Sequence, residues 1–179
     1  MNRLQMQYTT ELSLMDNTPS SLSLSWYTTP DDIKVLLVEA AAHWEVPEVA
    51  DVYLHRAIAC ADGQLDVLVS AYRYFFYQNR NGMALEIANR ILQEIRAAEQ
   101  LPTDWGRLRE VIEGRKDDPN IRLYLNAYAA SGFVLARLRH IDQAIAVLSR
   151  VCEVDRHNEF GARSVLNVLT QPATDDEDD

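Results

Sequence analysis

The chain has 179 residues, of which 47% are hydrophobic and 25% charged, and its formal net charge is −10 at pH 7. This composition is typical of a folded globular protein that is long enough to bury a core. The negative charge argues against general nucleic-acid binding and against attachment to anionic membranes, because both depend on basic side chains.

Residues 1–29 are richer in serine and threonine than the rest of the chain. Two alternating apolar runs, Leu12–Leu14 and Leu22–Trp26, flank a turn cluster at Asp16–Ser20. Alternation with a period of two around a turn predicts a β-hairpin. An isolated hairpin is marginally stable, so it would have to pack on the helices or on another chain. A loosely ordered N-terminal arm is the alternative, and the sequence leaves both open.

Helical patterns begin directly after this segment. Thr29 is a good N-cap residue, Pro30 suits the first helical position, and acidic residues follow in the first turn. Pro47 opens the next helix in the same way, and Asn79–Gly82 breaks the pattern again. We expect helices over 30–44, 47–61, 65–78 and 83–99.

An insertion, 99–124, comes next. Its apolar residues follow at spacings of four, three and four, which places them on one helical face. Thr103 is a candidate cap for this helix and Gly114 a candidate stop. The residues on the face are Leu101, Trp105, Leu108 and Ile112.

Three more helices are expected after the insertion, which brings the total to about eight. Asp117–Pro119 opens a long helix to about Leu138, and the last two cover 140–155 and 158–169. The last helix would cap the others. Residues 171–179 are acidic, and we expect a disordered tail there.

Three alanines, Ala50, Ala84 and Ala144, mark an internal repeat, because the apolar pattern recurs around each of them. The interval from Ala50 to Ala84 equals the period of about 34 residues that is typical of the paired helices in tetratricopeptide (TPR) arrays. The interval from Ala84 to Ala144 is longer by the length of the insertion. The sequence therefore predicts three helix pairs, with the insertion between the second and the third.

The segment Leu125–Asn158 resembles a TPR repeat along its whole length. Tyr128 stands at the first aromatic position of the family, and Gly132 at the small position where two helices cross closely. Its ending, Glu153–Asn158, is similar to the family's usual ending, with Arg156 in place of proline. The resemblance implies an all-α, TPR-like array of three repeats in one domain, 30–170. The repeats cover 31–64, 65–98 and 125–158.

The resemblance also implies a concave surface that binds another protein. The aromatic run Tyr72–Tyr77 covers the whole circumference of a helix, so its members cannot all be buried. In the repeat register, three of them face the concave side. The matching positions of the third repeat are Asn126, Phe133, Ala136 and Arg137. The predicted partner-binding groove is Arg73, Phe76, Tyr77, Asn126, Phe133 and Arg137. Alternatively, the insertion helix or the N-terminal arm fills this groove within the same chain.

Catalytic and metal-binding motifs are absent from the sequence. There is no glycine-rich phosphate loop, H-E-x-x-H, C-x-x-C or G-x-S-x-G. Glu39 and His43 lie one helical turn apart, but two ligands do not make a metal site. His55, on the next helix, could in principle join them. We therefore predict no catalytic residue, no metal and no cofactor.

The number of cysteines and the N-terminal sequence give an expectation about the cellular compartment. Cys60 and Cys152 are too few for a disulfide framework, and we expect both to be small buried side chains. No apolar run approaches the roughly 20 residues of a membrane span. Arg3 is followed by no continuous apolar segment, so we expect no secretory signal and a cytoplasmic protein.

These observations favour a non-catalytic protein–protein interaction module: an adaptor, an assembly factor or a dedicated chaperone. Its size, acidity and three repeats also resemble the class II chaperones of type III secretion translocators, although the insertion and the N-terminal arm depart from that pattern. A helical metal-dependent regulator or enzyme, and a subunit that works as a homo-oligomer, are the remaining alternatives.

Overall fold

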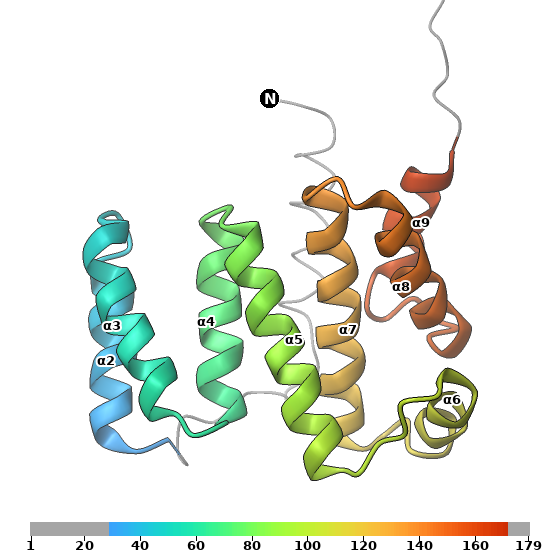
Figure 1. Ribbon diagram of the computed structural model, residues 1–179, viewed down its shortest axis with the longest axis horizontal. Helices are drawn as coiled ribbons and strands as arrows, with labels where there is room; N and C mark the ends of the chain where they lie inside the picture. Colours follow the sequence, from blue (N-terminus) through green and yellow to red (C-terminus); the bar gives the residue numbers. More distant parts are fainter. Residues whose placement is uncertain (1–28, 172–179) are drawn as a thin grey trace, which may run out of the picture.

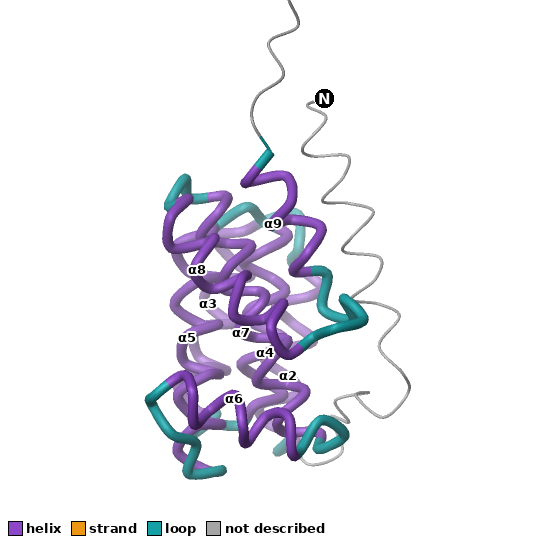
Figure 2. The backbone as a smooth tube through the Cα atoms, turned by 90° about the vertical axis from the view of Figure 1, so that its right-hand side faces the viewer, coloured by secondary structure: helices purple, strands orange, loops and turns teal. Residues whose placement is uncertain are grey.

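The computed structural model describes residues 29–171. Within this range the chain forms eight α-helices and no strand, so the all-α prediction is confirmed (Figure 2). Residues 1–28, where the hairpin or arm was predicted, and residues 172–179 of the acidic tail lie outside the described part. The helices are α2 (Asp31–Ala42), α3 (Pro47–Cys60), α4 (Leu65–Tyr77), α5 (Asn81–Ala98), α6 (Trp105–Gly114), α7 (Pro119–Arg137), α8 (Ile141–Val154) and α9 (Ala162–Thr170).

Apart from the insertion helix α6, the helices follow one another across the molecule in chain order (Figure 1). The pair α2–α3 forms one end of the row, α4 and α5 lie in the middle beside α7, and α8 and α9 form the other end. Short loops join the members of the pairs α2–α3, α4–α5 and α7–α8, so the two helices of each pair run antiparallel.

The turn between α4 and α5 has the same geometry as the turn between α7 and α8. Asn79 and Arg139 are separated by the same interval as Ala84 and Ala144, and both have a positive φ, of 57° and 64°. The next residues, Arg80 and His140, donate their N–H groups over 2.8 and 2.9 Å to the carbonyl groups of residues five positions earlier. Their ψ angles are 65° and 62°. The second and third copies of the sequence repeat therefore share this turn, whereas the connection between α2 and α3 lacks it.

The core contains the residues that mark the repeat. Ala50, Ala84 and Ala144 are each fully buried, at 0% exposure. Gly132 of α7 faces α8 so closely that a Cβ atom there would lie 2.7 Å from Leu148 Cδ2. Leu148 would have to shift to admit even a methyl group at this crossing, which agrees with the close approach expected at Gly132.

The insertion helix α6 packs on the α8 end of the row (Figure 1). The N-cap of α6 is Asp104, whereas the sequence suggested Thr103. Asp104 Oδ1 accepts a hydrogen bond of 3.1 Å from the N–H of Arg107. Leu108 is buried, and Trp105 Nε1 donates a hydrogen bond of 2.8 Å to Glu153 Oε2 on α8. These contacts hold α6 at the opposite end of the molecule from α2.

The last helix begins later than expected, at Ala162. The carboxylate of Asp155 accepts hydrogen bonds of 2.9 Å from the N–H groups of Glu159 and Phe160. Gly161 then takes a left-handed conformation, with φ of 70°. This turn delays the start of α9 beyond the predicted position 158.

Candidate partner-binding site

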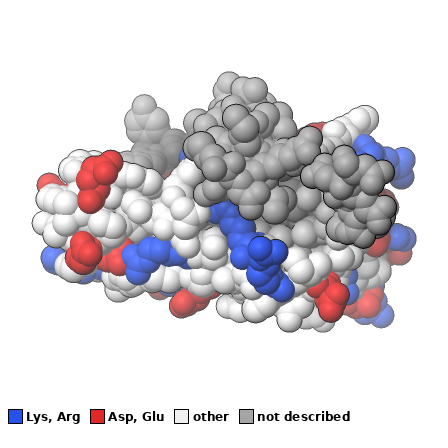
Figure 3. Space-filling model, turned by 90° about the horizontal axis from the view of Figure 1, so that it is seen from above, with Lys and Arg blue, Asp and Glu red and all other residues white. Residues whose placement is uncertain are grey.

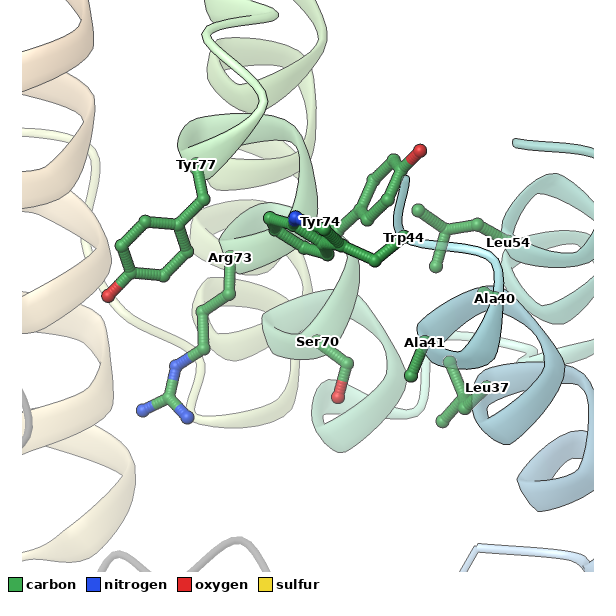
Figure 4. Close-up of a pocket in the computed structure, with 9 residues that line it drawn as sticks. All are labelled: Leu37, Ala40, Ala41, Trp44, Leu54, Ser70, Arg73, Tyr74 and Tyr77. Atoms are coloured by element: carbon green, nitrogen blue, oxygen red, sulfur yellow. The ribbon is translucent and has the colours of Figure 1, made fainter. Parts of the chain in front are cut away.

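An open pocket lies between α2 and α4, with a volume of about 270 Å³ (Figure 4). Helical spacing explains how the two helices form it. Ser70, Arg73 and Tyr77 share one face of α4, and Leu37, Ala41 and Trp44 project from α2 and its C-terminal end. The lining is mostly apolar, and Arg73 is its one charged member. The lining residues are Leu37, Ala40, Ala41, Trp44, Leu54, Ser70, Arg73, Tyr74 and Tyr77.

Trp44 and Tyr74 form the aromatic floor of this pocket. Their ring centroids are 5.3 Å apart and the rings meet edge to face, at 88°. The amide of Gln78 donates a hydrogen bond of 3.0 Å to the carbonyl group of Trp44, which ties the end of α2 to the end of α4. The floor is thus held in place before any ligand arrives.

Tyr74 also connects the pocket to α3. Its hydroxyl donates a hydrogen bond of 3.1 Å to Asp51 Oδ1, and the other oxygen of that carboxylate pairs with Arg80. Burial, and after it the hydrogen bond to Asp51, raises the pKa of the Tyr74 hydroxyl above its usual value. The phenol therefore keeps its proton at neutral pH and remains a donor.

The rim of the pocket is open to solvent. Tyr77 is 47% exposed, and Arg73 beside it is also exposed. On α2, Val38 is 54% exposed and lies three residues before the lining residue Ala41, so it continues the apolar surface beyond the pocket. Aromatic, aliphatic and guanidinium groups are thus available together on one side of the first two helix pairs.

The six residues of the predicted groove do not form one surface in the structure. Arg73 and Tyr77 line the pocket, but Phe76 and Phe133 are buried, at 3% and 8% exposure, which corrects the expectation that their rings form an open surface. Phe76 stacks on Tyr72, one turn earlier in α4, with ring centroids 5.5 Å apart. Phe133 packs toward the turn at Gly161, 3.9 Å from the position of a Cβ atom there.

Asn126 and Arg137, the other two predicted residues, are half-buried on α7. Arg137 covers the Phe76 ring and donates a hydrogen bond of 3.2 Å to the carbonyl group of Phe76. It therefore contributes to the packing of α7 on α4. Sequence reasoning missed Trp44 and Tyr74, although Tyr74 belongs to the aromatic run and Trp44 is a large aromatic residue at a helix end.

The histidines considered as metal ligands have other partners. His43 Nδ1 donates a hydrogen bond of 2.9 Å to the carbonyl group of Glu39, and its ring stacks on Tyr53 at 5.7 Å. His55 Nδ1 lies 2.8 Å from the carbonyl oxygen of Asp51. Between residues 29 and 171, no three His, Cys, Asp or Glu side chains are placed to share a metal ion.

The two cysteines differ in their surroundings. Cys60 is exposed, because it lies at the last position of α3 and points away from the core, so the expectation that it is buried was wrong. Cys152 is half-buried, and burial raises the pKa of its thiol.

Two properties of the described surface bear on the kind of ligand. No helix among residues 29–171 is both long enough and apolar enough to cross a bilayer. On the part of the face in Figure 3 that is not grey, both acidic and basic side chains stand among uncharged surface.

Comparison with known proteins identifies a relative. The chain is 33% identical over 144 residues to a protein of Azotobacter chroococcum mcd 1, described as an uncharacterized 19.8 kDa protein in the 5′ region of nifW. The match covers 76% of this chain and 81% of the relative. The chain belongs to the family of this 19.8 kDa protein. No model of a known protein family matches the chain, and no solved structure matches it.

Proposed function

We propose that this protein is a TPR-like helical array that acts as a non-catalytic protein-interaction module. The repeated turn at Asn79 and Arg139 supports the array, because it recurs at the same offset as the sequence repeat. The complete burial of the three alanines that mark the repeat supports it as well. Arrays of this kind use the side chains of successive helix pairs to form one extended binding surface.

The observation that carries the proposed function is the open pocket between α2 and α4. Its volume of about 270 Å³ lies below the range of roughly 300–1,000 Å³ that is usual for small-molecule and cofactor sites. One or two side chains of a protein ligand fill such a space. Trp, Tyr and Arg, which here are Trp44, Tyr77 and Arg73, are the residues most enriched among binding hot spots.

The chemistry of the pocket indicates the kind of partner. An apolar side chain fits against Trp44 and Leu37, and a carboxylate nearby on the same partner segment pairs with the guanidinium of Arg73. We therefore propose a partner segment with an apolar anchor next to an acidic residue. The gene of the 19.8 kDa relative lies in the 5′ region of nifW, so the product of a neighbouring nifW gene is one partner to test.

A photo-crosslinking experiment tests this function. Tyr77 is replaced by a photoreactive phenylalanine analogue, the full chain is expressed in its source cells, and crosslinked peptides are identified by mass spectrometry. The matched control carries the same analogue at Val52, which is 57% exposed on α3. We expect a discrete partner segment crosslinked at position 77 and not at position 52. The same adducts at both positions, or none at position 77, would contradict the proposal.

A further inference from the structure

After its charged first turn, helix α2 carries apolar side chains on both its core side and its outer side. Ile33, Leu37 and Ala40 face the core, while Val35 and Val38 project from the opposite side and are 59% and 54% exposed. Only Glu39 is charged between Val35 and Ala42. A helix that is hydrophobic all round is normally buried. The exposed side of α2, next to the pocket, is therefore a surface that a further segment can cover.

The chain itself supplies such a segment directly before α2. Leu22, Leu24 and Trp26 alternate with Ser21, Ser23 and Ser25. If this stretch is extended, its alternate residues point to opposite sides, and it would present one apolar edge and one serine edge. Thr29, which leads into α2, is buried at 3% exposure, so the chain enters the helix against the body of the protein.

The distances along the chain match the surface. If the segment doubles back at Thr29 and runs beside α2, Trp26, Leu24 and Leu22 lie about 10, 17 and 23 Å from Thr29, at about 3.3 Å per residue. On the helix, Leu37, Ala41 and Trp44 lie about 12, 18 and 22 Å from the same point, at about 1.5 Å per residue. The three apolar side chains of the segment therefore reach the levels of three residues that line the pocket.

We propose that Leu22–Trp26 docks along α2, with Leu22, Leu24 and Trp26 turned toward the pocket and the serines turned to solvent. Docking covers Val38 and Ala41 and places Leu22 near Trp44. This part of the inference rests on the proposed function: if the pocket is the partner site, the docked segment competes with the partner for it. The array is then self-blocked until a partner with higher affinity displaces the segment.

A disulfide trap tests the docking without any partner. In a chain with Cys60→Ser and Cys152→Ser, Leu24→Cys is combined with Ala41→Cys, and mild oxidation is followed by non-reducing electrophoresis and mass spectrometry. A disulfide requires Cα atoms about 4.4–6.8 Å apart and Cβ atoms that face each other. The control pair is Ser23→Cys with Ala41→Cys. Val38→Cys serves as a second acceptor, so that a shift of one helical turn is still detected.

We expect an intramolecular disulfide that forms at least about tenfold faster from position 24 than from position 23, with one of the two acceptors. Equal rates from both positions, no disulfide with either acceptor, or bonds between two chains would overturn the docking.

A second measurement separates this inference from the proposed function. Leu22→Asp with Leu24→Asp adds the same charge as the control, Ser21→Asp with Ser23→Asp, but it removes the apolar edge. We expect the leucine variant to bind the partner several-fold more tightly than the control. If the trap forms and partner affinity does not change, docking stands and the partner binds elsewhere. If no trap forms while Tyr77→Ala weakens partner binding, the docking is overturned and the partner site stands.

Discussion

The guanidinium of Arg137 lies 3.8 Å from the centre of the Phe76 ring and donates a hydrogen bond to the Phe76 carbonyl group. The two residues are far apart in the sequence and connect α7 to α4. A cation over an aromatic face is stabilising, and more so when both groups are shielded from water. This contact explains why two residues with the chemistry of a binding surface serve instead to hold the helix pairs together.

Arg137→Leu should lower the free energy of unfolding by about 1–2 kcal/mol, because it removes both the cation–π contact and the hydrogen bond to a partly buried carbonyl group. Arg73→Leu removes an exposed guanidinium from the pocket rim and should change stability by less than about 0.5 kcal/mol. Urea unfolding of the two variants measures the difference. Equal losses would show that Arg137 has no packing role.

Gly132→Ala should destabilise the protein by about 1–3 kcal/mol, since the added Cβ would lie 2.7 Å from Leu148 and force α7 and α8 apart. Gly82→Ala is the matched control in α5, where the new Cβ would have no atom within 4 Å apart from its own stretch of helix. That change should be neutral or stabilising by up to about 1 kcal/mol, because alanine favours the helix. Thermal unfolding should therefore move in opposite directions, and a parallel shift would contradict the close crossing.

Ala144→Leu should cost about 1–3 kcal/mol, because Ala144 is fully buried against Leu135 and Ala136 and has no room for a larger side chain. Ala146, two positions later on the same helix, is exposed and should tolerate leucine. Equal melting temperatures for the two variants would show that the repeat register assigned to α8 is wrong.

The contribution of Arg115 to stability should depend on pH. Its Nη2 atom lies 2.6 Å from carboxylate oxygens of both Glu99 and Asp118. Hydrogen bonding to Arg115 is the largest cause that lowers the pKa of each carboxyl group. A carboxyl group with a lowered pKa in the folded state stabilises the protein above its usual pKa, about 4, and this stabilisation is lost as the pH falls through the lowered value.

Arg115→Leu should therefore lower stability at pH 7 relative to wild type, and the difference should shrink as the pH falls below about 4. Urea unfolding over a pH series measures this, with Arg107→Leu as a control at an exposed position of α6. A difference between Arg115→Leu and wild type that stays constant from pH 7 to pH 3 would contradict the role of the two carboxylates.

Much of the helical architecture could be predicted from the sequence, because apolar spacing and caps are local signals. Pro47 and Pro119 mark helix starts in both the sequence and the structure. The start of α9 could not be predicted in the same way. It depends on Asp155 binding the backbone N–H groups of Glu159 and Phe160, a turn that apolar spacing does not reveal.

The site was less predictable because the helical period does not say which neighbour covers which side. The run Tyr72–Tyr77 surrounds α4, and the sequence could not show that Phe76 turns toward Arg137 while Tyr77 stays open. Trp44 was missed for a related reason. Its role depends on the edge-to-face contact with Tyr74, which belongs to another helix.

The most direct test of the partner site is the Kd of the crosslinked partner segment, measured by calorimetry for wild type, Tyr77→Ala, Arg73→Glu and the control Val52→Ala. Loss of a hot-spot side chain costs about 2 kcal/mol or more, which corresponds to a roughly 30-fold weaker Kd. We expect that loss for Tyr77→Ala, a loss for Arg73→Glu that is larger at low salt than at high salt, and no change for Val52→Ala. If the Tyr77 and Arg73 variants remain helical and bind with the wild-type Kd, the pocket between α2 and α4 is not the partner site.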